Sequence, residues 1–370
     1  MSRRKTNLSR PKPKSAAAPK DLVFHPVPEL ENQTLASALR RWLPGRSWTQ
    51  VRQLIQSRRV MVSGNLCVDV GRRLQLSDVV KILAKPAAAP PKDNDVRVQY
   101  LDKHLIVVEK PAGVTSNRHR EERDWPQRRK QIQPTLDELL PRVIDKIEGR
   151  GSRRGVPPPV RAVHRLDRDT SGLMVYARTR EAERALSEQF RAHTTHRRYI
   201  AIVHGKVSSQ TFRTRLIRDR GDGRRGSTKE PNVGKEAITH VKPLDFVEFA
   251  GSEAKTEGGR GRAEAANVGN NRGGYYTLIE CRLETGRTHQ IRIHLSEHGN
   301  PLCGEKVYLP KKNGKPMADN SGSPRLALHA AELGFEHPVS RKALRFQAAL
   351  PLELTNFWRH LKQRGETNRR

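Results

Sequence analysis

Apolar residues recur at helical spacing in the first quarter of the chain. Leu35, Ala38, Leu39 and Trp42 fall on one face of a helix predicted over residues 34–43. A second helix is predicted where Val51, Leu54 and Ile55 share a face, with Ser47 or Thr49 as its N-cap. Alternating segments at 60–62 and 66–68 flank a Ser-Gly-Asn turn and predict a hairpin, and residues 79–83 predict a closing strand. Residues 28–85 are therefore expected to form a small domain of two helices followed by a sheet.

A second, larger pattern of strands and helices follows a Pro/Ala-rich stretch. Residues 86–97 have the composition of an extended linker. Beyond it, continuous apolar runs predict strands at 104–110, 173–177, 198–205 and 276–283. Helices are expected from Thr135, with Glu138 completing a capping box and Pro141 kinking or dividing the helix, over 180–190, and from a Thr288 cap to about Gly299. Residues 98–362 are thus expected to form a second α+β domain.

The charge of the chain favours a polyanionic partner. The 370 residues include 71 Lys and Arg against 39 Asp and Glu, a formal net charge of +32. Such a field attracts phosphate polymers, although charge alone cannot separate RNA from DNA. Two basic, apolar-poor ends, residues 1–27 and 363–370, are expected to be disordered, and the Gly-rich stretch 250–274 is expected to be a flexible surface insert.

Basic residues also gather around the second predicted helix. Arg46, Arg52, Arg58 and Arg59 lie on or beside it with few acids nearby. Two helices and a small sheet with this basic face resemble the S-four-type RNA-binding domain, first known from a ribosomal protein of the small subunit. The alternative is an ordinary solvated basic helix face. The resemblance implies that these four arginines contact RNA.

Several other classes of protein find no support in the sequence. Cys67, Cys281 and Cys303 are too far apart for a zinc spacing and odd in number, and the histidines form no metal-binding pattern. No phosphate-binding or dinucleotide-binding glycine motif occurs. Neither a membrane-spanning apolar stretch nor a signal peptide is apparent, so a cytoplasmic protein with no metal and no cofactor is expected.

The most specific string is His-Arg-Leu-Asp-Arg-Asp-Thr-Ser-Gly at 164–172. It resembles the signature of RluA-type pseudouridine synthases, which implies that Asp167 is the catalytic residue. The same resemblance makes Arg165 a candidate to fill the space that an extruded base leaves, and His164 a part of the fold or an RNA contact. The run at 104–113 resembles the first strand of this family, and its Lys110 is a candidate RNA contact.

Two further strings extend the resemblance. Residues 197–205 match the family strand that carries an active-site tyrosine, here Tyr199, which is expected to stack on the target base. The run Thr-Gly-Arg-Thr-His-Gln-Ile-Arg at 285–292 matches the third motif, and the resemblance implies that Arg287 pairs with Asp167. Segments 301–308 and 326–338 continue the match. In the family this domain is a mixed, mostly antiparallel sheet flanked by helices.

The expected function is therefore isomerisation of selected uridines in structured RNA to pseudouridine. Asp167 would act either as a nucleophile on the sugar or as a base that removes a ribose proton, and the sequence leaves both open. The accessory domain favours large-subunit rRNA over tRNA, and a monomer is expected. Two alternatives are a non-catalytic RNA-binding factor of ribosome assembly, and an RNA glycosylase or nuclease that uses Asp167 together with Asp169.

Overall fold

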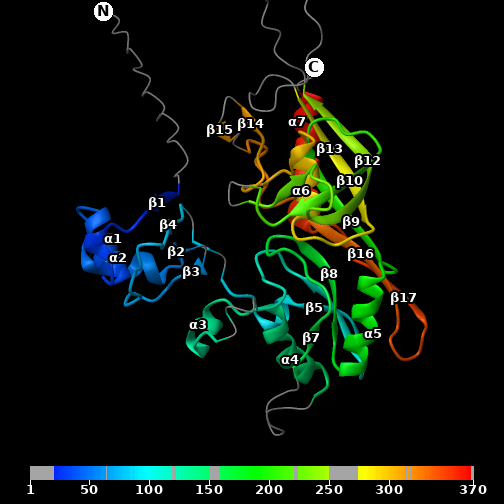
Figure 1. Ribbon diagram of the computed structural model, residues 1–370, viewed down its shortest axis with the longest axis horizontal. Coiled ribbons are helices and arrows are strands. Elements are labelled where there is room, and N and C mark those ends of the chain that lie inside the picture. Colours follow the sequence, from blue (N-terminus) through cyan, green and yellow to red (C-terminus); the bar gives the residue numbers. More distant parts are fainter. Residues whose placement is uncertain are drawn as a thin grey trace, which may run out of the picture. The chain divides into compact units, whose positions relative to one another are not determined.

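The computed structural model divides the chain into two compact units, Met1–Ala89 and Pro90–Arg370. It describes residues 21–367 with the exception of 64, 85, 88, 119–121, 123, 150–158, 221–223, 250–273, 313–314 and 317–318. The division falls inside the stretch 86–97 that composition predicts as a linker. Figure 1 shows the elements of both units coloured along the chain.

The first unit contains the predicted helices and sheet. Helix α1 spans Leu35–Trp42 and α2 spans Trp48–Gln56, where Ser47 is the N-cap and forms a capping box with Gln50. Strands β2 (Val60–Val62) and β3 (Asn65–Leu66) form the hairpin, and β4 (Val80–Ile82) pairs with β2. Leu39 and Ile55 are completely buried in the core between the helices and the sheet. The amphipathic spacing therefore predicted this unit correctly.

The expected disorder at the two ends of the chain is wrong for the residues nearest the folded units. Leu22–Phe24 form strand β1, which pairs antiparallel with β4, because the ring of Phe24 stacks on Trp42 with centroids 5.0 Å apart. A short 3-10 helix follows at Pro28–Leu30. At the other end, helix α7 (Leu352–Thr367) continues through the range 363–367, where Gly365 is buried. Residues 1–20 and 368–370 lie outside the described residues.

The second unit is built on an eleven-stranded sheet. Its order is β11-β10-β12-β13-β9-β16-β8-β6-β5, with β17 beside β16 and β7 beside β8. All described pairings are antiparallel except that of β16 with β8, which confirms a mixed, mostly antiparallel sheet. The strands are β5 Arg97–Leu101, β6 Leu105–Lys110, β7 Arg161–Ala162, β8 Ser171–Ala177, β9 His196–His204, β10 Gln210–Ile217, β11 Gly226–Thr228, β12 Lys235–Phe249, β13 Gly274–Leu283, β16 Leu328–Glu336 and β17 Ala343–Gln347. A separate hairpin joins β14 (Lys311–Lys312) to β15 (Lys315–Pro316).

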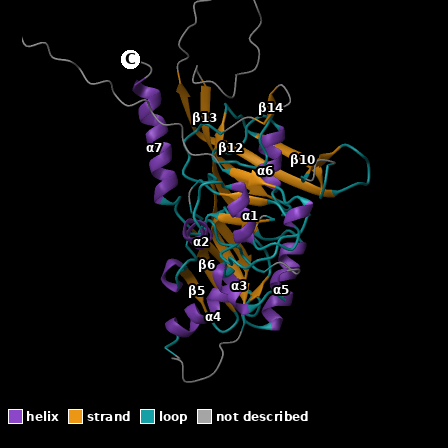
Figure 2. Cartoon of the chain, turned by 90° about the vertical axis from the view of Figure 1, so that its left-hand side faces the viewer, coloured by secondary structure: helices purple, strands orange, loops and turns teal. Residues whose placement is uncertain are grey.

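Helices cover both faces of this sheet. Alternation along β8 sends Met174 and Tyr176 into one core with Leu140 of α4 (Leu136–Ile147), while Leu173 and Val175 enter another core with Leu186 of α5 (Arg180–Arg191). Helix α6 (Gln290–Glu297) joins the α4 side, and α7 packs a third core. Figure 2 shows β10, β12 and β13 towards one end of this unit and β5 and β6 towards the other. Burial on both faces explains why the central strands read as continuous apolar runs.

Two helix details differ from the expectation. Pro141 does not divide α4, which continues through it although proline has no N–H to donate to the carbonyl of Asp137. Helix α6 begins after His289, which has a left-handed φ of 60°, and Thr288 is not its cap. A short helix, α3 (Gln127–Ile132), and a 3-10 turn at Asp93–Asp95 complete the described elements. The insert predicted at 250–274 lies outside the described residues up to 273.

Candidate active site

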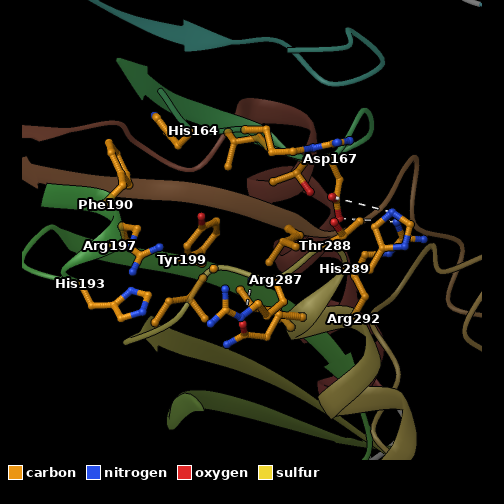
Figure 3. Close-up of a pocket in the computed structure, with 18 of the residues that line it drawn as sticks. His164, Asp167, Phe190, His193, Arg197, Tyr199, Arg287, Thr288, His289 and Arg292 are labelled. Carbon is orange, nitrogen blue, oxygen red and sulfur yellow. Dashed lines mark hydrogen bonds and ion pairs between the residues drawn. The ribbon is translucent and has the colours of Figure 1, made fainter. Parts of the chain in front are cut away.

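One cavity of about 360 Å³ is lined by all the candidate residues of the second unit except Lys110. Its walls come from the β7–β8 loop, the end of α5, β9 and the segment from Leu283 to Arg292. The volume lies within the roughly 300–1,000 Å³ typical of small-molecule sites. Five predicted residues line it: His164, Arg165, Asp167, Tyr199 and Arg287. Figure 3 shows His164, Asp167, Tyr199 and Arg287 around the cavity. The convergence that the three strings predicted is therefore present.

The loop of Asp167 is clamped by the loop that follows β6. The Ser116 hydroxyl donates to the carbonyl of Leu166 at 2.8 Å and accepts from its N–H at 3.1 Å. Leu166 itself is buried in the core beneath. On the other side of Asp167, the carbonyl of Arg168 accepts from the Gly113 N–H at 2.7 Å and from Lys110 Nζ at 3.0 Å. The position of the carboxylate is thus fixed through both neighbours along the chain.

Lys110 belongs to this clamp, and the prediction that it contacts RNA is wrong. Its side chain is 1% exposed and its Nζ donates to the carbonyls of Pro111, Val114 and Arg168 at 2.8–3.0 Å. Three acceptors match the three donors of an ammonium group. Burial lowers the pKa of Lys110 to about 7, and the nearby carboxylates of Asp169 and Asp167 oppose that shift. A residue held in this way positions the loop and cannot reach a phosphate.

Asp167 has one cationic neighbour, Arg292, and one imidazole neighbour, His289, whose pKa is lowered by burial; neither is Arg287. Arg292 Nη1 lies 3.6 Å from Oδ2, and His289 Nε2 lies 3.8 Å from Oδ1. The guanidinium of Arg287 instead donates through Nε to the carbonyl of Glu236 on β12, at 2.9 Å. The predicted pairing is corrected accordingly. Arg292 lies in the first turn of α6 and faces the carboxylate, whereas Arg287 precedes the helix and bonds to β12.

A buried acid that the sequence did not reveal holds Arg292 in place. Glu305 accepts from Arg292 Nε at 2.8 Å and from Nη2 at 2.7 Å, and its side chain has no exposed surface. Burial raises the pKa of Glu305, but the hydrogen bonds and charge of Arg292 outweigh burial, and the net pKa is lowered. Its Oε1 also accepts backbone N–H groups of residues 306 and 307. Glu305 therefore orients Arg292, which in turn holds Asp167.

The opposite wall of the cavity carries the aromatic rings of Tyr199, His164 and Phe190, none of them charged, with the guanidinium of Arg197 over the ring of Phe190. Tyr199 is 8% exposed, and burial raises its pKa to about 12, so the phenol is neutral near pH 7. The ring of His164 stacks on Phe190 with centroids 4.3 Å apart, and its Nε2 accepts the N–H of Val175 at 3.1 Å. Burial, with a contribution from Arg197, lowers the pKa of His164 to about 3. Flat neutral groups beside one carboxylate suit a planar heterocycle attached to a sugar.

The other predicted residues are divided between exposed and enclosed positions. Arg165 is exposed at the cavity rim. Asp169 is exposed and does not line the cavity, which removes the second carboxylate that a hydrolytic glycosylase would need. In the first unit, Arg46 and Arg52 are exposed, while Arg58 and Arg59 are half-buried and donate to the carbonyls of Ala87 and Ala84.

The described residues contain neither a metal-binding cluster nor a membrane-spanning helix. Within them, no group of three or more His, Cys, Asp or Glu side chains is arranged to hold a metal ion. No helix in the part of the chain that the structure describes has the length and apolarity to cross a membrane.

Comparison with known proteins agrees with the geometry. The sequence model of the RNA pseudouridylate synthase family matches residues 104–297. The ribosomal large subunit pseudouridine synthase D of Zymomonas mobilis is 35% identical over 274 residues, which is 74% of this chain and 74% of that protein. The uncharacterized RNA pseudouridine synthase YlyB of Bacillus subtilis is 32% identical over 343 residues, covering 90% of this chain and 93% of that protein.

A solved structure shares the fold. The human protein RNA pseudouridylate synthase domain containing 4 aligns with 72% of this chain and 92% of its own, with a TM-score of 0.50 at 20% identity. The family match spans the loop of Asp167, the strand of Tyr199 and all of α6. The chain therefore belongs to the RNA pseudouridylate synthase family and is an enzyme that forms pseudouridine in RNA.

Proposed function

We propose that Asp167 is the catalytic residue that converts specific uridines of structured RNA to pseudouridine. The observation that carries this is a single carboxylate, 15% exposed, at the edge of an aromatic cavity and held by Arg292. In the reaction the bond from the sugar's anomeric carbon to the ring nitrogen breaks, and carbon five of the uracil takes its place. The composition of the RNA is unchanged, because the proton lost from carbon five is balanced by one gained at the freed nitrogen.

Asp167 can begin this reaction in either of two ways. Its carboxylate can attack the anomeric carbon, or it can remove a proton from the ribose. Both routes need a carboxylate held in a fixed position, which Arg292 and the clamped loop provide. Tyr199, neutral at working pH, provides a wall on which the freed uracil can stay stacked while it turns.

Tritium release from RNA labelled at carbon five of uracil tests this proposal, because bond formation there expels that hydrogen. The Asp167→Asn variant should release none, while its affinity for RNA stays within about threefold of wild type. Asp169→Asn is the matched control and should retain activity, because that carboxylate is outside the cavity. Turnover by Asp167→Asn comparable to wild type would refute the assignment.

The favoured substrate is large-subunit rRNA, with tRNA second. Support comes from the relatives whose names state action on the ribosomal large subunit. Pseudouridine mapping of rRNA and tRNA in cells with and without the gene would identify the position. A site lost on deletion and restored by the wild-type gene, but not by an Asp167 variant, would link substrate and residue. Loss confined to tRNA would overturn the rRNA proposal.

The first unit is proposed to be an S-four-type RNA-binding domain. Exposed Arg46 and Arg52 beside α2 are its best candidates for phosphate contacts, because Arg58 and Arg59 already donate to backbone carbonyls. Replacing Arg46 and Arg52 with Gln should weaken RNA binding and flatten the dependence of log K on log salt by about one unit per residue. An unchanged salt slope would contradict their role. The enzyme is further proposed to act as a monomer without a cofactor, which the molecular mass of the active purified chain in solution and its activity without added cofactor would test.

A further inference from the structure

The cavity has a second charged region, formed by residues that do not contact Asp167. Arg197, on β9, lines it together with Arg287 and His193 (Figure 3). Arg197 is only 8% exposed, and its Nη2 donates to the backbone carbonyl of Glu284 at 2.7 Å. Its Nε is buried and has no hydrogen-bond partner among the described residues. A guanidinium is therefore held inside the cavity with part of its hydrogen-bonding capacity unused.

Unlike other arginines nearby, Arg197 and Arg287 are not neutralised by an acidic side chain of the described residues. Arg198, the next residue on β9, pairs with Glu280 and Glu332, and Arg292 pairs with Glu305 and Asp167. Within the described residues, neither Arg197 nor Arg287 forms an ion pair, and both donate to backbone carbonyls instead. Buried charges are normally paired, so the buried guanidinium of Arg197, unpaired within the described part of the chain, calls for an anion from outside, and the half-buried Arg287 adds a second positive charge in the same cavity.

The neighbouring acids are already engaged. Glu284 accepts from His240 at 2.6 Å through its side chain, and Glu236 pairs with Arg213 at 2.9 Å. Burial lowers the pKa of His193, and the positive charges of Arg197 and Arg287 lower it further. The three side chains therefore lie close enough to sense one another's charge. Burial likewise lowers the pKa of Arg197, although an arginine remains protonated at any working pH.

We propose that Arg197 and Arg287 bind an RNA backbone phosphate next to the uridine that enters the cavity. The site takes a phosphodiester, because paired guanidinium groups match its oxygens in charge and in planar donor geometry. This inference rests on the proposed function, since the phosphate arrives with the target nucleotide. The cavity then grips the nucleotide at two ends, with the sugar and base at Asp167 and Tyr199 and the phosphate at Arg197 and Arg287.

Removing the phosphate charge from the substrate tests the pairing directly. Synthetic RNA spanning the mapped uridine would carry one methylphosphonate, at either of the two linkages that flank that uridine. Single-turnover kcat/KM of the wild type should fall about ten- to a hundredfold at one of these linkages. In Arg197→Met the same methylphosphonate should lower kcat/KM less than about threefold, because the guanidinium that would bind the phosphate charge is already absent. Arg359→Met, which removes an exposed charge on α7, should keep the full wild-type response.

A second variant covers the case in which Arg197→Met does not fold. A Cβ added at Gly286 would lie 2.7 Å from Arg197 Nη1, so Gly286→Ala displaces the guanidinium without deleting it. It should reduce the methylphosphonate effect in the same way. If wild type converts all three RNAs equally, the phosphate site is refuted and the proposed function stands. If wild type fails on the unmodified RNA, the proposed function is what fails.

Discussion

Removing Arg292 should separate the stability of the enzyme from its chemistry. Arg292→Met keeps a side chain of similar length but leaves the fully buried carboxylate of Glu305 without its two charge-assisted hydrogen bonds at 2.7 and 2.8 Å. Deleting one partner of a buried ion pair typically costs about 3–5 kcal/mol. The free energy of unfolding of the catalytic unit should fall by about that amount. Activity should fall at least about a hundredfold, because Asp167 also loses its cationic neighbour.

A double variant distinguishes the two effects. Adding Glu305→Gln neutralises the stranded acid and keeps an oxygen to accept the backbone N–H groups of residues 306 and 307. Urea unfolding of the two single variants and the double variant then forms a cycle, and the double variant should recover about 1–3 kcal/mol. Tritium release should stay at the level of Arg292→Met, since nothing has been returned to Asp167. Arg287→Met is the comparison, because its Nε bonds only a backbone carbonyl and its loss should leave the stability of the Glu305 pair intact.

Wild-type activity in the double variant would refute the proposed role of Arg292 at Asp167. That result would mean that Arg292 serves only to neutralise Glu305 and has no part in holding Asp167. An undiminished free energy of unfolding in Arg292→Met would equally contradict the buried pair.

Three further changes follow from the geometry. Burial lowers the pKa of Lys110 from 10.5 to about 7 in the folded protein. Between pH 7 and pH 10.5 the lysine is therefore protonated in the unfolded chain but largely neutral in the folded one. The free energy of unfolding of wild type relative to Lys110→Met should therefore rise by about 2–3 kcal/mol from about pH 6 to about pH 9 in urea titrations. A flat difference would show that the three carbonyls keep the ammonium charged. Gly172→Ala should lower the free energy of unfolding, measured by thermal unfolding, by at least about 3 kcal/mol, because φ at this position is 120° and the new Cβ would lie 2.2 Å from the carbonyl oxygen of Ala330. An unchanged free energy of unfolding would contradict the strand register at Gly172. Burial raises the pKa of Tyr199 to about 12. The absorbance of the tyrosinate band should therefore follow the same titration curve in wild type and in Tyr199→Phe up to about pH 10. A difference between the two curves below that pH would show that the Tyr199 phenol ionises there.

Hydrophobic periodicity predicted the elements that bury either one face or both faces. Helices α1, α2 and α5 and strands β6, β8, β9 and β13 each carry a run long enough to be recognised. Strand β10 was missed because its residues alternate between half-buried and exposed without a strong apolar face. Strand β1 was missed for a different reason. Three residues beside a basic tail become a strand only because β4 offers a free edge and Trp42 offers a ring to Phe24.

At the active site, the sequence motifs predicted which residues come together but not which side chains contact one another. Motif strings brought Asp167, Tyr199, His164 and Arg165 to one cavity, but a string does not state in which direction a side chain points. The run 285–292 contains two arginines five residues apart, and only the start of α6 at Gln290 decides which of them meets the carboxylate. Lys110 posed the same problem, since a lysine at the end of a strand is compatible with phosphate contact until the three carbonyls around it are known.

The division of labour among the arginines of the cavity follows from which acids the fold brings to them. Arg292 receives Glu305 from a segment outside the helix, so its charge is fixed in place and serves Asp167. Arg197 and Arg287 receive only backbone carbonyls, so their charges remain available within the cavity. Side chains of the same type thus take opposite roles in one enclosed space, one as a fixed part of the machinery and two as binding groups. Local sequence cannot encode that difference, because the deciding partner, Glu305, lies thirteen residues beyond Arg292 and on no shared element.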